Sequence, residues 1–525
     1  MATAHTALRI GIDVGGTNTD AVVMRGRDVR AACKTPTTPD VGSGIRTALA
    51  DALRQAQTQP DAIGAVMIGT THFTNAFVQA RSLARVGALR LAAPATTSLP
   101  PFVDWPDTLR AVVEGHVAVV HGGYNYDGSE IARVRPEEVR AAAETMRDRG
   151  VRCVAISSVF APVNDAQERL AASIVKQVIP GAAITMSHAI GRVGLLEREN
   201  AAIMNASLAG MADDVVRSFG EAVASLGIRC PFYVSQNDGT LMPPALAATF
   251  PVLTFASGPT NSIRGGGFLS GLDDCIVVDI GGTTTDVGVL QSGFPRESAI
   301  AVDIGGVRTN FRMPDVLSIG LGGGSRVRAT ERGITVGPDS VGFRLLQEGL
   351  VFGGETLTAT DVAVAAGKAQ CGDAAPVRGL DRALVDGALA RLRELLEDAI
   401  DRVKTSSSDV PVVLVGGGTI LAHRDLRGAS RVVVPEQASV ANAVGAAIAQ
   451  AGGEVDQVYS YAARGREAEL AEAKAAATAR AVAAGANPAT VRVVDVEELP
   501  LQYLPGGAVR VRVKAVGELA AVGGA

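Results

Sequence analysis

The most informative stretch of the sequence is Ile10-Gly-Ile-Asp-Val-Gly-Gly-Thr-Asn-Thr-Asp20, whose pattern returns as Val278-Asp-Ile-Gly-Gly-Thr-Thr-Thr-Asp286. In each copy an apolar run leads into an aspartate, two glycines follow, and hydroxyl-bearing residues precede a second apolar run. This order predicts two β-strands joined by a tight glycine turn. A repeat of this kind predicts a molecule with two halves built on the same plan.

The two glycine turns are candidates for binding phosphate. A Rossmann or Walker turn must open a helix, whereas each turn here joins a strand to a strand. Glycines let backbone N–H groups approach phosphate oxygens closely, and hydroxyls add further donors. A single copy fits an ordinary hairpin equally well, but two copies in matched context favour phosphate binding. The predicted contacts are Gly15, Gly16, Thr17 and Asn18 in the first turn and Gly281, Gly282, Thr283 and Thr284 in the second.

Asp13 and Asp279 end the first strand of each copy, and both are predicted catalytic residues. Mg²⁺ is a hard cation that prefers carboxylate, water and phosphate oxygens, so we expect both aspartates to hold Mg²⁺ through water. A third Asp-Ile-Gly-Gly begins at Asp303, but no hydroxyl cluster follows it. We interpret it as an unrelated turn.

Two further glycine loops are candidates for contact with a bound nucleotide. Gly416, Gly417 and Gly418 follow an apolar strand, where a loop without side chains can pass beneath a nucleoside, although a plain strand-end loop is the alternative. Gly322 and Gly323 belong to three consecutive glycines, which cost backbone entropy without adding packing. We predict nucleotide or substrate contact there. The small residues of 441–447 predict a helix that packs closely against a neighbour.

Short Val/Ile-rich runs alternate with longer helical patterns, which is typical of an α/β fold. An apolar stripe between Val385 and Val403 predicts a long helix. Near the end of the chain a helix is expected over 466–484, followed by strands at 491–496 and 508–516 around a turn at 505–507. In the last strand valines alternate with Arg510, Arg512 and Lys514, which predicts one buried and one solvent-exposed face.

The bulk composition excludes several classes of protein. The 525 residues carry 49 basic and 54 acidic side chains, a net charge of -5, with no basic block that could follow a nucleic acid. No apolar run has the length of a membrane helix, and the first residues do not resemble a signal peptide, so we expect a soluble, cytoplasmic protein. The five cysteines show no metal-binding spacing and are interpreted as reduced thiols, and no transition metal is expected.

Beyond the two turns, the chain resembles the hydantoinase and 5-oxoprolinase family of the actin-like ATPase superfamily, in the manner of a hydantoinase A subunit. The resemblance extends from about Leu8 to Gln450. Its motifs, in chain order, are Gly69-Thr-Thr-His-Phe-Thr-Asn75, His121-Gly-Gly-Tyr-Asn-Tyr-Asp-Gly-Ser-Glu130, Ser158-Val-Phe160 with 164–169, Ser235-Gln-Asn-Asp-Gly239, Ser257-Gly-Pro259 and Gly320-Leu-Gly-Gly-Gly-Ser325.

The resemblance implies two actin-like, ribonuclease H-like lobes around an ATP cleft and a small α+β module at the C-terminal end. The corresponding division is an N-terminal hydantoinase/oxoprolinase domain at 1–190, a hydantoinase A domain at 191–454 and the module at 455–525. Its implied cofactors are ATP and Mg²⁺. Its implied activity is hydrolysis of a cyclic amide after phosphorylation of the ring amide oxygen, which would turn a poor electrophile into an imidate phosphate.

Other functions stay open at this stage. The carboxylase branch of the family, a small-molecule kinase and a non-catalytic ATP switch would use the same fold. Asn18, His72 and Phe73 depart from the family pattern, so the substrate can differ. Family members often work with a separate B subunit, and this partner or a homo-oligomer is left open.

Several polar residues have both a functional and a structural interpretation. His72 is a candidate catalytic residue in a polar loop, with a structural histidine as the alternative. Asp127 and Glu130 are more simply a solvated turn, and Asp238 is either a turn residue or part of a cleft. Arg198, Glu199 and Asn200 are expected at the start of a long helix, where exposed charge or helix capping is the simplest explanation of these polar side chains.

Overall fold

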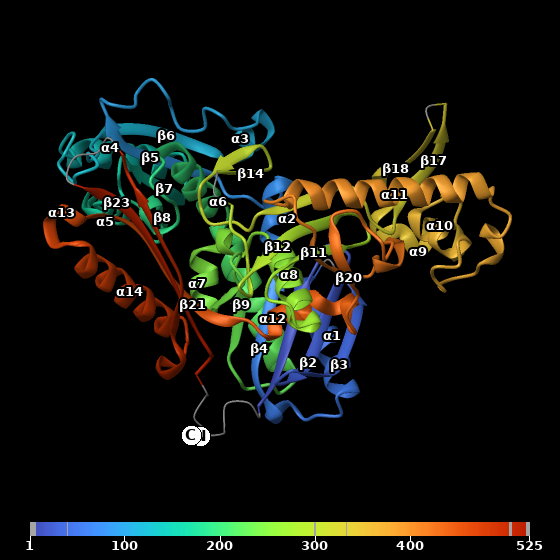
Figure 1. Ribbon diagram of the computed structural model, residues 1–525. Helices are drawn as coiled ribbons and strands as arrows, with labels where there is room; N and C mark the ends of the chain where they lie inside the picture. Colours follow the sequence, from blue (N-terminus) through green and yellow to red (C-terminus); the bar gives the residue numbers. More distant parts are fainter. Residues whose placement is uncertain (1–6, 39, 299–300, 332, 503–506, 521–525) are drawn as a thin grey trace.

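The two glycine turns lie in two different β-sheets of the computed structural model, which describes residues 7–38, 40–298, 301–331, 333–502 and 507–520 (Figure 1). The first sheet has nine strands. In spatial order they are β22 (Arg492–Pro500), β23 (Ala508–Gly517), β21 (Gln450–Ser460), β10 (Thr240–Met242), β9 (Phe232–Ser235), β4 (Ile63–Thr70), β1 (Leu8–Val14), β2 (Asn18–Arg25) and β3 (Asp28–Pro36).

The second sheet has six strands and repeats the plan of the first around its own turn. Its strands are β13 (Phe294–Pro295), β12 (Thr285–Gln291), β11 (Cys275–Ile280), β19 (Val410–Val415) and β20 (Ala429–Val433), with β16 (Val316–Ile319) also on β12. β1 pairs antiparallel with β2 and parallel with β4, and β11 pairs in the same way with β12 and β19. The predicted duplication is therefore present in the strand pairing.

Two helices cross at very short distance between the sheets, α8 (Ser257–Ser270) and α12 (Ala441–Ala447). A Cβ atom added to Gly265 would lie 1.8 Å from the carbonyl oxygen of Ala441, and one added to Gly445 would lie 1.8 Å from that of Asn261. Only glycine allows this backbone approach, so the predicted small-residue helix packs as expected. The crossing brings α12 against β1 and α8 against β11.

A third, parallel sheet of four strands is built from β6 (Glu114–His121), β5 (Val86–Ala93), β7 (Cys153–Ser158) and β8 (Ala183–Met186). The helices α4 (Pro136–Asp148), α5 (Ala166–Val178) and α6 (Leu195–Ser225) pack against it. The expectation of exposed charge at 198–200 is wrong, because all three side chains are buried. Glu199 and Arg90 form an ion pair of 2.5 Å, since a buried charge needs a partner.

The second sheet is covered by α11 (Arg382–Val403), which presents its apolar stripe as predicted. Beside it lie the hairpin of β17 (Ser325–Thr330) and β18 (Gly333–Ser340) and the helix α10 (Ala359–Ala365) (Figure 1). The third Asp-Ile-Gly-Gly is the turn between β14 (Val302–Ile304) and β15 (Val307–Thr309), in a separate two-stranded sheet. It takes no part in the repeat.

The C-terminal segment has the expected helix, α14 (Arg466–Ala483), and the expected strands. Its strands extend the nine-stranded sheet, because β21 pairs with β10, and α14 packs on β21 and β23 (Figure 1). Of the turn expected at 505–507, only Gly507 lies within the described residues. The prediction that one face of β23 is exposed to solvent is wrong. Lys514 is buried, and Arg510 and Arg512 are largely covered by acidic side chains of other elements.

Within the described residues, all five cysteines are free thiols, as expected. Of the helices in these ranges, none combines the length and apolar character needed to traverse a bilayer.

Candidate functional site

The two glycine turns have the same internal geometry. In the first, the N–H of Gly15 donates to the carbonyl oxygen of Asn18 at 3.0 Å, and in the second, Gly281 donates to Thr284 at 2.9 Å. No hydrogen bond in the described part of the chain uses the N–H groups of Gly16, Thr17, Gly282 or Thr283. Each turn therefore keeps consecutive free backbone donors, which is the arrangement that binds anions.

Asp13 lies directly opposite Asp20 on β1 and β2, and both carboxylates are buried. The side-chain amide of Asn442, on α12, donates to Asp13 Oδ2 at 3.1 Å and to Asp20 Oδ2 at 2.7 Å. Burial, and then the charge of Asp20, raise the pKa of Asp13 to about 7. Asp13 Oδ1 forms no regular hydrogen bond among the described residues, although the nearby side-chain amide of Asn261 lowers the pKa of Asp13.

The second turn repeats this carboxylate pair as Asp279 and Asp286, which lie opposite each other on β11 and β12. Burial is the main cause that raises the pKa of Asp279, although this residue keeps a partly accessible edge, and burial also raises the pKa of Asp286 to about 6. Ser318 donates a hydrogen bond to Asp286. The charge of Asp279 acts in turn on the pKa of Asp13, so the two turns lie within electrostatic range of each other.

Lys34 is the cation nearest to these carboxylates. It extends from β3, where its backbone pairs with Asp20, and its Nζ lies 2.5 Å from Asp20 Oδ1. Its charge also lowers the pKa of Asp279, which belongs to the other sheet. Lys34 therefore partly neutralises both carboxylate pairs.

The predicted glycine loops both pack on the second turn. Gly416 has a φ of +87°, and a Cβ added there would lie 2.3 Å from Asp279 Oδ1, so the position requires glycine. The N–H of Gly418 donates to the carbonyl oxygen of Ile280 at 2.7 Å, while Gly417 faces open space.

In the loop of Gly322 and Gly323, the N–H of Gly323 donates to the carbonyl oxygen of Gly281 at 3.0 Å. A Cβ added to Gly322 would lie 2.6 Å from the N of Thr283. Both loops are therefore positioned to support this turn, and their contact with a nucleotide stays a prediction.

His72 opens α2 (His72–Val78), directly after β4, at the same edge of the sheet as Asp13. Burial lowers the pKa of His72, and its ring takes part in no hydrogen bond or ion pair among the described residues. On the same helix, the Thr74 hydroxyl is buried and has no hydrogen-bond partner within the described ranges, and a Cβ added to Gly16 would lie 3.9 Å from Asn75 Nδ2. The catalytic role of His72 stays a prediction.

Sequence reasoning missed several residues of this site. Asp20 and Asp286 stood inside the quoted repeat, and their equal spacing from Asp13 and Asp279 was the signal that could have identified them. Asn442 was noted only as part of a small-residue helix. No pattern indicated Lys34, or Asn261 on α8, whose buried amide has no hydrogen-bond partner in the described ranges.

The residues at the turns fit a phosphate-bound Mg²⁺. Asp13 combines an unpartnered buried oxygen with a pKa raised by burial and by a neighbouring carboxylate, and an added positive charge would relieve both. No group of three or more histidine, cysteine, aspartate or glutamate side chains in the described residues is arranged to hold a metal by itself. A Mg²⁺ bound by one or two carboxylates together with water and phosphate is compatible with this arrangement.

Comparison with known proteins identifies the family. The model of the hydantoinase/oxoprolinase N-terminal region matches residues 9–179, and the hydantoinase/oxoprolinase model matches residues 198–403. The chain belongs to the hydantoinase/oxoprolinase family. The family resemblance of the sequence motifs is therefore confirmed.

Among curated relatives of this hydantoinase/oxoprolinase chain, the caprolactamase subunit alpha of Pseudomonas jessenii is 28% identical over 422 residues, covering 75% of this chain and 58% of the relative. The acetophenone carboxylase gamma subunit of Aromatoleum aromaticum is 26% identical over 391 residues, covering 68% of this chain and 53% of the relative. This chain thus spans little more than half the length of either protein.

Solved structures confirm the fold class. The ATP-dependent caprolactamase from Pseudomonas jessenii matches with a TM-score of 0.78 at 20% identity, covering 98% of this chain and 88% of the other. Nucleotide-free acetone carboxylase matches with a TM-score of 0.68 at 18% identity and the same coverage. The α/β architecture with actin-like lobes is therefore shared with these proteins.

Proposed function

We propose that this chain is an ATP-dependent enzyme that opens a cyclic amide by phosphorylating its carbonyl oxygen before hydrolysis. The observation that carries the proposal is the pair of matched turns, each with free backbone donors and with an opposed pair of carboxylates. This arrangement supports binding of the phosphates of ATP from two sides. The choice of a cyclic amide rests on similarity to a caprolactamase subunit.

In this proposal the free N–H groups of Gly16, Thr17, Gly282 and Thr283 bind phosphate oxygens. Asp13 and Asp279 would hold Mg²⁺ through water, and that ion supplies charge neutralisation when it is bound. The positive charge of Lys34 partly neutralises the carboxylates of both sheets. His72, at the same edge as Asp13, would contact the amide substrate. A hydantoinase B subunit and a homo-oligomer remain candidate partners.

The test uses ε-caprolactam labelled with ¹⁸O in its carbonyl, together with Mg·ATP and the purified chain. Attack of the amide oxygen on the γ-phosphorus forms an O–P bond and releases ADP, so hydrolysis leaves the label in inorganic phosphate. Mass spectrometry of the phosphate and of the ring-opened amino acid reads both products. Phosphate without the label would exclude phosphorylation of the amide oxygen.

The carboxylase branch is the second candidate, because the acetophenone carboxylase gamma subunit is also similar to this chain. Incubation with acetophenone, bicarbonate and Mg·ATP tests it. A carboxylated ketone in place of a ring-opened acid would select this function, and a stable phosphoester with sugars would select a kinase.

A further inference from the structure

A cavity of about 860 Å³ lies at the carboxyl ends of β7 and β8, away from both glycine turns. The turn between β9 and β10, the first half of β21 and the end of α14 close it from the other side. Leu246, Phe250, Leu253 and Ala483 supply apolar lining. The carboxyl ends of parallel strands are a common place for ligands, and the volume suits a small organic molecule.

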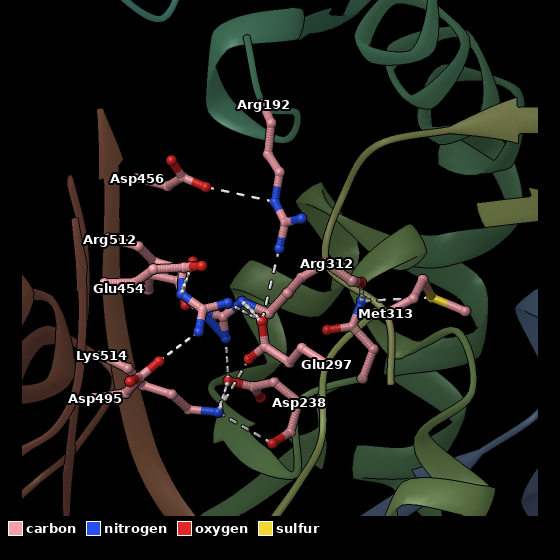
Figure 2. A network of polar contacts seen from close by, with 12 residues as sticks. Arg192, Asp238, Glu297, Arg312, Met313, Glu454, Asp456, Asp495, Arg512 and Lys514 are labelled. Carbon is pink, nitrogen blue, oxygen red and sulfur yellow. Dashed lines mark hydrogen bonds and ion pairs between the residues drawn. The ribbon is translucent and has the colours of Figure 1, made fainter. Parts of the chain in front are cut away.

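Charged side chains on one wall of the cavity, including Asp238, Arg312 and Asp456, belong to a network that continues behind this wall to β23 (Figure 2). Arg510 donates to both oxygens of Asp456, at 2.7 and 2.5 Å. Arg512 lies 2.6 Å from Glu297, and Lys514 lies 3.0 Å from Asp238, which also pairs with Arg312. These carboxylates are thus already provided with close cationic partners.

Arg192 differs from the other cations of this wall. Its guanidinium lies 3.4 Å from Asp456 and 3.6 Å from Glu297, and it donates no hydrogen bond within the described residues. Figure 2 shows it reaching toward these two carboxylates from a separate loop. Its side chain is 16% exposed and lines the cavity, so a ligand there can reach its donors. The backbone of Arg192 is fixed, since its N–H donates to Asn310 Oδ1 at 3.1 Å and its carbonyl oxygen accepts from Arg198 at 2.9 Å.

The other cationic side chains that line the cavity form hydrogen bonds. Arg169 pairs with Asp165 at 2.6 Å, and Arg480 donates to the carbonyl oxygen of Glu454 at 2.5 Å. His188 lies between Glu168 and Asp165, and Arg312 pairs with Glu454 as well as with Asp238. Arg192 is therefore the lining arginine that forms only two long ion pairs, so its planar fork of donors makes no hydrogen bond within the described residues.

A planar fork of N–H donors matches the two oxygens of a carboxylate. We propose that this cavity binds a small organic carboxylate with an apolar body, and that Arg192 is its anchor. The site does not depend on the reaction proposed above. The ring-opened product of a lactam has this chemistry, and so has an unrelated organic acid.

Calorimetric titration of the full chain with sodium hexanoate at constant ionic strength, without ATP, tests the proposal. Saturable binding is expected for hexanoate and not for hexanamide, which has the same body without the charge. Arg192→Gln should weaken the binding by roughly tenfold to a hundredfold. The matched control Arg480→Gln, on the same lining, should bind hexanoate like the unaltered chain. Tighter binding of 6-aminohexanoate than of hexanoate would identify the lactam product as the source of the ligand.

The proposal is overturned if hexanoate does not bind saturably, if hexanamide binds equally well, or if Arg192→Gln binds like the unaltered chain. Thermal unfolding checks that each variant is folded, and Arg192→Lys, which keeps the charge but loses the fork, should weaken binding severalfold. A crystal of the unaltered chain soaked with 6-bromohexanoate provides a measurement without any variant. Its anomalous bromine signal should lie in this cavity with the carboxylate on Arg192, and a position elsewhere would contradict the assignment.

Discussion

Asp13 and Asp20 lie directly opposite each other on neighbouring strands, and one side-chain amide, that of Asn442, donates a hydrogen bond to both. Like charges in this position repel each other, so the pair stores an unfavourable interaction that a cation would relieve. Asp279 and Asp286 repeat the arrangement in the second sheet. The duplicated carboxylate pair is the feature on which the following predictions depend.

Asp13→Asn should reduce phosphate release from Mg·ATP by roughly two orders of magnitude, because the carboxylate proposed to hold the ion becomes a neutral amide. The fold should remain, since a carboxyl whose pKa is raised to about 7 is already neutral for much of the accessible pH range. The matched control is Asp303→Asn, in the third Asp-Ile-Gly-Gly, whose exposed turn takes no part in the repeat. Equal losses in both variants would contradict the role of Asp13.

The stability of the chain without nucleotide should depend on the ionisation of Asp13. Its pKa is raised from 3.8 to about 7, so the folded state retains a proton that the unfolded chain has lost. The contribution of Asp13 to the free energy of unfolding is therefore greatest below pH 3.8. It falls by on the order of 4 kcal/mol as the pH rises from there to about 7.

Denaturant unfolding from pH 4 to 8 of the unaltered chain and of Asp13→Asn measures this difference. The variant should gain stability relative to the unaltered chain as the pH rises. Asp286→Asn should show the same trend over a narrower interval, because the pKa of Asp286 is raised only to about 6. A constant difference between variant and unaltered chain at every pH would refute the assignment.

Local patterns predicted the parts of the site that depend on neighbours in the chain. A tight turn between two strands fixes which residues face each other, so the pairing of Asp279 with Asp286 follows from their spacing. The strand that leads into Asp13, the strand before Gly416 and the helix with the 385–403 stripe could also be predicted, because their apolar patterns are local.

Contacts between residues far apart in the chain could not be predicted from the sequence. Asn442 reaches Asp13 from 429 residues further along the chain, and the crossing of α8 and α12 that brings it there depends on tertiary packing. The alternation in β23 correctly predicted a strand, but it could not show that acidic side chains of other segments cover Arg512 and Lys514. The alternation of side chains along a strand shows which residues share a face, but not which other segments of the chain cover that face.

Lys34→Gln should shift the acid limb of the pH dependence of kcat/KM to higher pH. The cation beside Asp20 also lowers the pKa of Asp279, so its loss makes the carboxylates harder to ionise. Lys34→Arg keeps the charge and should leave the limb near its original position. A Lys34→Gln enzyme with lower kcat but an unmoved limb would show that Lys34 acts in another way.

Gly416→Ala should weaken Mg·ATP binding, because the new Cβ would lie 2.3 Å from Asp279 Oδ1 and must displace either the loop or this carboxylate. The φ of +87° adds strain for any other residue, and together these effects should lower the free energy of unfolding by roughly 1–3 kcal/mol. Gly353→Ala is the matched control, since this glycine has a similar φ of +89° but its Cβ would meet no atom within 4 Å. Nucleotide titration and denaturant unfolding of both variants separate the two effects. If Gly416→Ala loses stability but binds Mg·ATP with unaltered affinity, the loop supports the fold and not the position of Asp279.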